Sequence, residues 1–263
     1  MIDYKKAEKE FRQYLKNYDL NEGIIKSKVN HTYGVVSLSE YIARDLNLSE
    51  EDMELDKLIA LLHDIARFEQ AKIYGDYRDY KNIDHAELAI KILFEDNLIR
   101  NYIVDDSYDS IILKAIKNHN KLKIEDGLNE EELLHSKIIR DADKTDNFRV
   151  NVSDSFEDIF HSSKEKLGHG RITEKIYNDF LSNKMIVSKE RKNDLDCWIS
   201  CLAFIYDYNF LAGLKYIKEK NYINICIDRI DYQMDDTKNK IEEIRKHAIN
   251  YLEDRLCSHN NHS

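Results

Sequence analysis

The stretch Lys57-Leu-Ile-Ala-Leu-Leu-His63-Asp64-Ile-Ala-Arg67-Phe68 decides how the rest of the chain is interpreted. Its apolar residues predict a buried helix, yet an imidazole and a carboxylate stand side by side within it. Polar groups of this kind are costly to bury unless they are paired. We therefore expect His63 and Asp64 to find their partners in other parts of the chain.

Other residues that commonly bind metal ions fall on the apolar faces of further expected helices. His31, for example, precedes Val35 by one helical turn in a helix expected over about residues 24–46. Histidines such as His135 and His169 fall instead in polar contexts. The set on apolar faces, drawn from five expected helices, is His31, His63, Asp64, His85, His119 and Asp143.

This set of imidazoles and carboxylates predicts a metal site. Nitrogen and oxygen donors without cysteine suit Zn, Mn, Fe or Co better than Ca or Mg alone. Six ligands exceed the three or four protein ligands of one catalytic ion, so we expect two ions bridged by a carboxylate. The expected cofactor is a divalent transition metal, with Fe, Mn, Zn, Co and Ni as alternatives.

The composition favours an all-α fold. The 263 residues include no proline and only seven glycines, so strong helix breakers are few. We expect a helical core over residues 1–150, with its motifs between 31 and 147, and a helical extension over 151–263 packed on that core. Expected loops cover residues 69–83, a candidate lid, and 150–171. Helices are then expected over about 172–184, 193–219 and 236–257, the middle one buried and central.

The charge and the apolar runs restrict the partners. A net charge of −10 argues against general nucleic-acid binding, which needs clustered Lys and Arg, but leaves small phosphorylated ligands open. The longest apolar run, residues 197–206, is too short to cross a bilayer, and the charged N-terminal residues do not resemble a signal peptide. We expect a cytoplasmic protein that makes no membrane contact, with homo-oligomers open.

The order of the six residues resembles the HD superfamily of metal-dependent phosphohydrolases, whose pattern is H…HD…H…H…D. The resemblance covers about residues 24–150. Its supporting segments are Leu62-His-Asp-Ile-Ala-Arg67, Asp84-His-Ala, Asn118-His-Asn and Arg140-Asp-Ala-Asp143-Lys-Thr-Asp-Asn147. The two histidines between the HD pair and the final aspartate resemble the superfamily's binuclear branches. These include cyclic-dinucleotide phosphodiesterases and dinucleoside-polyphosphate hydrolases. The branch that cleaves cyclic di-GMP carries a Gly-Tyr-Pro signature, which a chain without proline cannot contain.

By this resemblance Asp64 would bridge two ions, with His31, His63 and Asp143 on one and His85 and His119 on the other. The implied reaction is hydrolysis of a phosphate ester or anhydride of a nucleotide-like molecule by a metal-activated water. A phosphomonoesterase and a phosphodiesterase both fit this description. The alternatives are a di-iron oxygenase with the same ligands and a non-catalytic nucleotide sensor.

Several neighbours of the ligands are expected to assist. Arg67, one turn after His63, is expected to act with Asp64 in catalysis by reaching a substrate phosphate. Asn147 is expected to orient Asp143 or a water, while Asp141 and Asp146 are expected to lie outside the ligand set. Further candidates for substrate contacts are Lys144, Arg78 and Tyr77.

Overall fold

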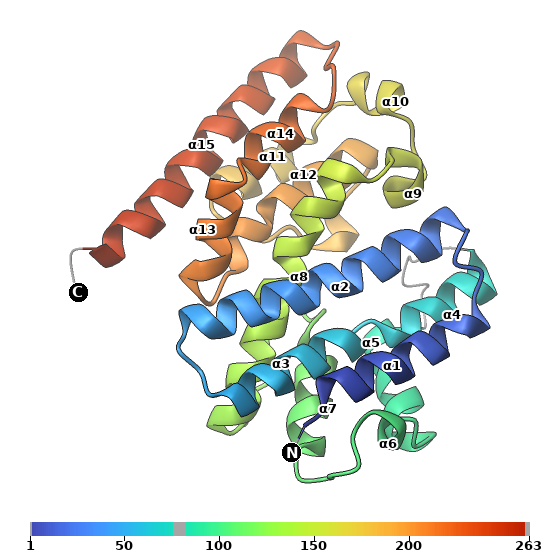
Figure 1. The fold of residues 1–263 in the computed structure, drawn as a ribbon. Helices are drawn as coiled ribbons and strands as arrows, with labels where there is room; N and C mark the ends of the chain where they lie inside the picture. The colour runs from blue at the N-terminus through green and yellow to red at the C-terminus, as the bar shows by residue number, and fades with distance from the viewer. Residues whose placement is uncertain (1, 76–82, 261–263) are drawn as a thin grey trace. The chain divides into compact units, whose positions relative to one another are not determined.

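The computed structural model describes residues 2–75 and 83–260 of the chain, and side chains through residue 258. Within these ranges the chain forms helices and connecting turns and no strand, which confirms the predicted all-α class (Figure 1). The chain divides into two compact units, residues 1–146 and 147–263, and α8 (Glu130–Ser153) contributes to both.

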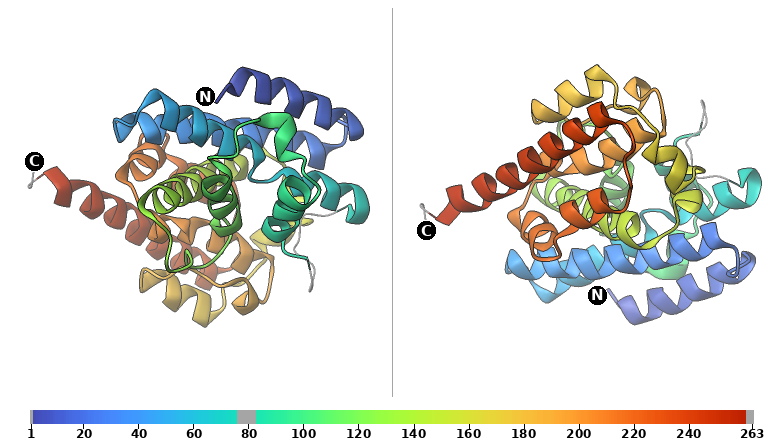
Figure 2. Two further views of the ribbon diagram at one scale, coloured as in Figure 1. Left: turned by 90° about the horizontal axis from the view of Figure 1, so that it is seen from below. Right: turned by 90° about the horizontal axis from the view of Figure 1, so that it is seen from above.

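The first unit contains a helical hairpin and several shorter helices. Ser49 begins the second arm of the hairpin, because its hydroxyl oxygen accepts from the Asp52 N–H and three acidic residues occupy the first turn. The two arms, α2 and α3, lie side by side, and α1 packs against α3 (Figures 1 and 2). The helices are α1 (Tyr4–Tyr14), α2 (Gly23–Asp45), α3 (Glu50–Leu62), α4 (Ile65–Tyr74), α5 (His85–Ile90), α6 (Ile99–Tyr102) and α7 (Asp109–Asn118).

The expectation of one helix through the His63-Asp64 pair is wrong. Helix α3 ends at Leu62, and α4 begins at Ile65 with Asp64 as its N-cap residue. The Nδ1–H of His63 donates to the Ala60 carbonyl oxygen at 2.7 Å. In a continuous helix that oxygen would accept from the Asp64 N–H. The imidazole therefore takes the place of a backbone bond, and the chain turns between His63 and Asp64.

The expected loop over 69–83 is wrong for its first part. Helix α4 continues to Tyr74, and Gly75 ends it in the left-handed conformation with φ of 63°. Lys72 is therefore on an exposed face of α4. Residues 76–82, which include Tyr77 and Arg78, lie outside the described residues, so the lid and these two substrate contacts stay predictions.

The second unit replaces the loop expected over 150–171 with short helices. Ser155 and Ser163 each cap a helix, their hydroxyl oxygens accepting from the N–H groups of Asp158 and Lys166. These helices bury Phe156 and Leu167, although the mostly polar residues around them in the sequence had suggested a loop. The helices are α9 (Phe156–Phe160), α10 (Lys164–Gly168), α11 (Glu174–Leu181), α12 (Asp194–Leu202), α13 (Leu211–Glu219), α14 (Tyr222–Asp228) and α15 (Asp235–Asn260).

The single central helix expected over 193–219 is also wrong. It is two helices, α12 and α13, separated by a 3-10 segment (Ala203–Asp207) and by extended backbone at Tyr208 and Phe210. Its apolar residues nevertheless lie in the core of the second unit, around the fully buried Trp198. Helix α15 packs along α11, α13 and α14 as the longest helix of this unit (Figure 2).

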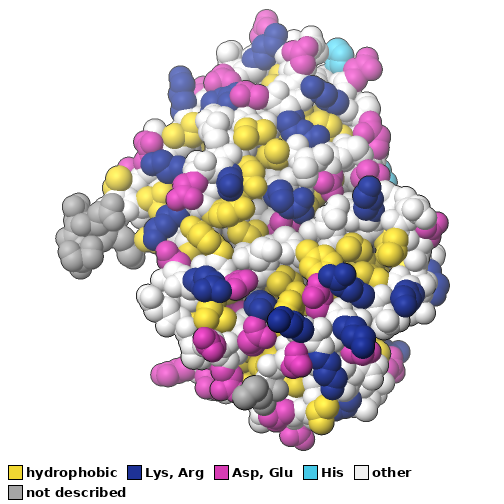
Figure 3. Space-filling model, in the orientation of Figure 1, with side chains coloured by type: hydrophobic (Ala, Val, Ile, Leu, Met, Phe, Trp, Pro, Cys, Tyr) yellow, Lys and Arg dark blue, Asp and Glu magenta, His cyan; other side chains and the backbone are white. Residues whose placement is uncertain are grey.

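Two surface properties bear on the expected partners. None of the described helices combines the length and apolar character needed to cross a membrane. On the face shown in Figure 3, Lys and Arg side chains are interspersed with Asp and Glu. The exclusion of general nucleic-acid binding and the cytoplasmic location stay predictions.

Candidate metal centre

The six predicted ligands meet in the first unit, and four of them stand at helix ends. His63 follows the last residue of α3, and Asp64 precedes α4. His85 is the first residue of α5, and His119 follows the last residue of α7. His31 and Asp143 lie within the longer helices α2 and α8. Because these helix ends point into the cluster, the helices can place their nitrogen and oxygen atoms around it from several directions.

Asp64 lies at the centre, and its two carboxylate oxygens face different histidines. Oδ2 lies 3.4 Å from His63 Nε2 and 3.7 Å from His31 Nε2. Oδ1 lies 3.5 Å from His85 Nε2 and 3.6 Å from His119 Nε2. The two oxygens therefore divide the cluster into two halves that share one carboxylate.

Asp143 joins the first half. Its Oδ1 lies 3.1 Å from His31 Nε2 and 4.0 Å from His63 Nε2. His85 Nε2 and His119 Nε2, in the second half, lie 3.0 Å apart. The geometry thus brings together all six residues in the grouping that the sequence resemblance implies.

Hydrogen bonds at Nδ1 orient three of the imidazoles. The Nδ1–H of His119 donates to the Ile116 carbonyl oxygen at 2.6 Å, just as His63 donates to Ala60. His31 donates from Nδ1 to Asp146 Oδ2 at 2.8 Å. Each bond places a proton on Nδ1 and leaves Nε2 facing the cluster, and Nε2 can bind a metal ion once it carries no proton of its own.

The bond between His31 and Asp146 depends on a glycine. Gly34 lies one turn after His31 on α2, and a Cβ atom there would stand 2.0 Å from Asp146 Oδ1. The missing side chain lets the Asp146 carboxylate, which is fully buried, approach the α2 backbone. Gly34 and Asp146 therefore fix the orientation of His31 together.

Electrostatics keep the central carboxylates ionised. Burial raises the pKa of Asp64, but the Lys28 ammonium and the nearby His63 and His119 outweigh it and hold that pKa well below its usual range. Burial also opposes ionisation of Asp143, yet its hydrogen bond to His31 lowers the pKa below the ordinary value. Ionised carboxylates are the form that binds metal.

The donor set fits two metal ions. His63 Nε2 and Asp64 Oδ1 are buried and have no hydrogen-bond partner among the described residues, a costly state that a cation would relieve. Ligand atoms about 2.0–2.2 Å from one ion are separated by roughly 3–3.6 Å, close to the spacings around each Asp64 oxygen. Two groups of ligand atoms are compact enough to hold an ion: His31, His63 and Asp64, and Asp64, His85 and His119.

The other predicted site residues differ in what the structure shows. Arg67 lies beside the cluster, with Nε 3.7 Å from Asp64 Oδ1. Lys144 is buried, and its Nζ donates to the Arg140 carbonyl oxygen at 3.4 Å. Asn147, one turn after Asp143 on α8, is the first residue of the second unit, and its orienting role stays a prediction.

Sequence reasoning missed Lys28, whose Nζ lies 2.8 Å from Asp64 Oδ2. Its spacing of three residues before His31 places both on one face of α2, which was the available signal. The interpretation of His135 was wrong: it is buried, and its Nδ1 lies 2.7 Å from Asp56 Oδ1. The polar residues next to His135 in the sequence do not indicate that it is buried against Asp56.

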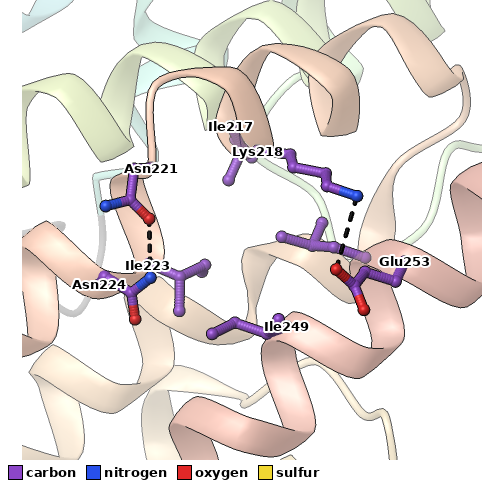
Figure 4. A pocket seen from close by; sticks show the side chains of 8 residues that line it. Ile217, Lys218, Asn221, Ile223, Asn224, Ile249 and Glu253 are labelled. Carbon is purple, nitrogen blue, oxygen red and sulfur yellow. Dashed lines mark hydrogen bonds and ion pairs between the residues drawn. The ribbon is translucent and has the colours of Figure 1, made fainter.

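The structure also has a pocket formed entirely by the second unit (Figure 4). Its apolar lining includes Ile217, Ile223 and Ile249, and its polar groups pair with one another. Lys218 Nζ lies 3.6 Å from Glu253 Oε1, and Asn224 donates to Asn221 at 2.7 Å. None of its lining residues is a histidine or a cysteine, so it offers no comparable metal site.

The fold and the cluster define an all-α protein with a candidate metal centre. In a comparison with family models, residues 29–147 match the HD domain. This range includes all six predicted ligand residues, so the similarity to the HD domain covers the whole cluster. The searches of curated proteins and of solved structures found no match.

Proposed function

We propose that the protein is a metal-dependent phosphohydrolase that cleaves a phosphate ester or anhydride of a nucleotide-like small molecule. The observation that carries this proposal is the position of Asp64, whose two oxygens face two separate groups of histidines. A carboxylate shared in this way is what a pair of ions requires of its bridging ligand.

His31, His63 and Asp143 would hold one ion, His85 and His119 the other, and Asp64 both. Bound divalent ions supply Lewis acidity and a water whose pKa is lowered towards neutrality. The nitrogen and oxygen donors suit Fe, Mn, Zn, Co and Ni alike.

The protein's own side chains supply orientation and substrate binding. The Nδ1 hydrogen bonds of His31, His63 and His119 hold their rings in place, so the Nε2 atoms are positioned before metal ions bind. Arg67 is oriented in turn, since its Nη1 donates to the buried Gln70 Oε1 at 2.8 Å. A guanidinium held beside the cluster can donate two parallel hydrogen bonds to two oxygens of a phosphate group.

The test combines metal analysis with a substrate screen. Protein purified anaerobically is analysed for metals and then assayed for phosphate release from mononucleotides, cyclic nucleotides and dinucleoside polyphosphates. We expect two ions per chain in the wild type, and loss of both metal and hydrolysis in Asp64→Ala. The control is Asp126→Asn, an exposed carboxylate in a turn.

Three results would contradict the proposal. One is an Asp64→Ala variant that retains both metal and hydrolysis. Another is oxygen consumption with a polyol or phosphonate in place of phosphate release, which would indicate a di-iron oxygenase. The third is bound metal and nucleotide without turnover of any substrate, which would indicate a sensor.

A further inference from the structure

Among the residues that the structure describes, two half-buried cations flank Asp64, one beside each carboxylate oxygen. Lys28 Nζ lies 2.8 Å from Oδ2, the oxygen that faces His31 and His63. Arg67 Nε lies 3.7 Å from Oδ1, the oxygen that faces His85 and His119. Both side chains are 15% exposed, so neither charge is freely solvated.

The surroundings of Arg67 place its charge at the edge of the second half. Gln70 holds Nη1, and Nη2 lies 3.4 Å from His85 Nε2. Lys28 reaches the first half from α2, where it stands one turn before His31. The two cations therefore approach the cluster from different helices and on different sides.

This arrangement becomes unfavourable once metal ions bind, unless an anion also binds. In the structure, the Asp64 carboxylate balances the charge of the Lys28 ammonium. Two divalent ions would carry four positive charges, more than the three carboxylates of Asp64, Asp143 and Asp146 supply together. Lys28 and Arg67 would add two more. Like charges in a poorly solvated site repel strongly, so the loaded centre needs additional negative charge.

We propose that Lys28 and Arg67 bind the oxygens of a terminal phosphate group, and that this selects phosphomonoesters or polyphosphate ends over phosphodiesters. A terminal phosphate carries a charge of roughly −1.5 to −2 at pH 7, whereas a diester carries a single negative charge. The larger charge better balances two ions and two cations. Lys28 lies one residue before the range that matches the HD domain, so that match does not include it.

This inference rests on the proposed function and is tested by binding rather than turnover. Isothermal titration calorimetry measures the affinity of inorganic phosphate and of dimethyl phosphate for the manganese-loaded full chain. The variants are Lys28→Gln and Arg67→Gln, and the control is Lys26→Gln, an exposed lysine on the same helix. Metal content is measured for each.

We expect phosphate to bind the wild type and Lys26→Gln at least tenfold more tightly than dimethyl phosphate. Lys28→Gln and Arg67→Gln should each weaken phosphate binding about tenfold, as for the loss of a charge-assisted hydrogen bond. Dimethyl phosphate should be affected less. Metal content should stay at the wild-type value, because neither residue is a ligand.

Unchanged phosphate affinity in either variant that folds and retains metal would overturn the proposal, as would equal affinity of the wild type for the two anions. If neither Gln variant retains metal, Lys28→Arg decides: it should bind metal and phosphate, and metal binding without phosphate binding would overturn the proposal. If the wild type hydrolyses a phosphate compound while the variants give these contradicting results, only the role of Lys28 and Arg67 fails and the proposed hydrolysis does not. A wild type that hydrolyses no phosphate compound would instead overturn the proposed function.

Discussion

Gly34→Ala tests whether the packing of α2 against Asp146 orients His31, a predicted metal ligand. The added Cβ would stand 2.0 Å from Asp146 Oδ1 and 2.5 Å from Asp146 Cγ, so the carboxylate must move. Asp146 is fully buried and holds His31 Nδ1 at 2.8 Å. A shift of Asp146 therefore weakens or breaks that hydrogen bond.

Two opposing effects set the size of the stability change. Alanine is favoured over glycine within a helix by about 0.5–1 kcal/mol. Overpacking a close-packed interior costs about 1–3 kcal/mol, and losing a buried hydrogen bond to a charged group costs about 1.5–3 kcal/mol more. The costs exceed the gain, so Gly34→Ala should lower the free energy of unfolding by roughly 1.5–5.5 kcal/mol.

The metal should respond as well. Loss of the carboxylate that orients a ligand histidine lowers metal affinity about 10–100-fold. Urea denaturation of the metal-free chain measures stability, and calorimetric titration measures metal affinity. Asp146→Asn is the matched variant, because it keeps the size of the side chain while removing its charge. A Gly34→Ala protein that is more stable than the wild type and binds metal equally well would refute the reasoning.

Three further predictions concern the same unit. Burial raises the pKa of Asp56 to about 6 despite its contact with His135, so the folded state binds this proton more tightly than the unfolded chain. The protonated Asp56 therefore stabilises the fold fully below about pH 4, and roughly 3 kcal/mol of this stabilisation is lost as the pH rises to about 6. The difference in unfolding free energy between wild type and Asp56→Asn should show this trend. A difference that does not change with pH would contradict it. Ser49→Ala should cost about 1 kcal/mol in urea denaturation through loss of the α3 cap, and no change would show that the cap contributes nothing. Removing metal with a chelator should lower the melting temperature of the wild type but not that of Asp64→Ala, since only a chain that binds ions is stabilised by them.

The sequence predicted the helical class and singled out six residues that the structure brings together, because both depend on local patterns. An imidazole on an apolar helix face is visible without any knowledge of tertiary structure, as at His31 and His85. The positioning residues were less visible. Asp146 acquires its role only because α8 passes close to Gly34 on α2, and nothing in the sequence around either residue indicates that contact.

The second unit shows a different limit. The residues around Phe156 and Leu167 are mostly polar, so their short helices have too few apolar positions to produce a periodic signal. The segment 193–219 has the opposite property: it is apolar on all sides, and such a pattern does not show where one helix ends. Burial in a common core around Trp198 accommodates both segments.

The break between α3 and α4 explains how adjacent residues can serve one site. Neighbouring residues in a continuous helix point about 100° apart, so His63 and Asp64 would face different surroundings. The chain instead turns at Asp64, whose φ of −110° and ψ of 20° are not helical. His63 Nε2 and Asp64 Oδ2 then lie 3.4 Å apart. The His63 ring donates a hydrogen bond to the Ala60 carbonyl oxygen, in place of the backbone bond that would continue the helix. His63 therefore supplies a nitrogen to the cluster and also produces the turn that brings Asp64 between the two groups of histidines.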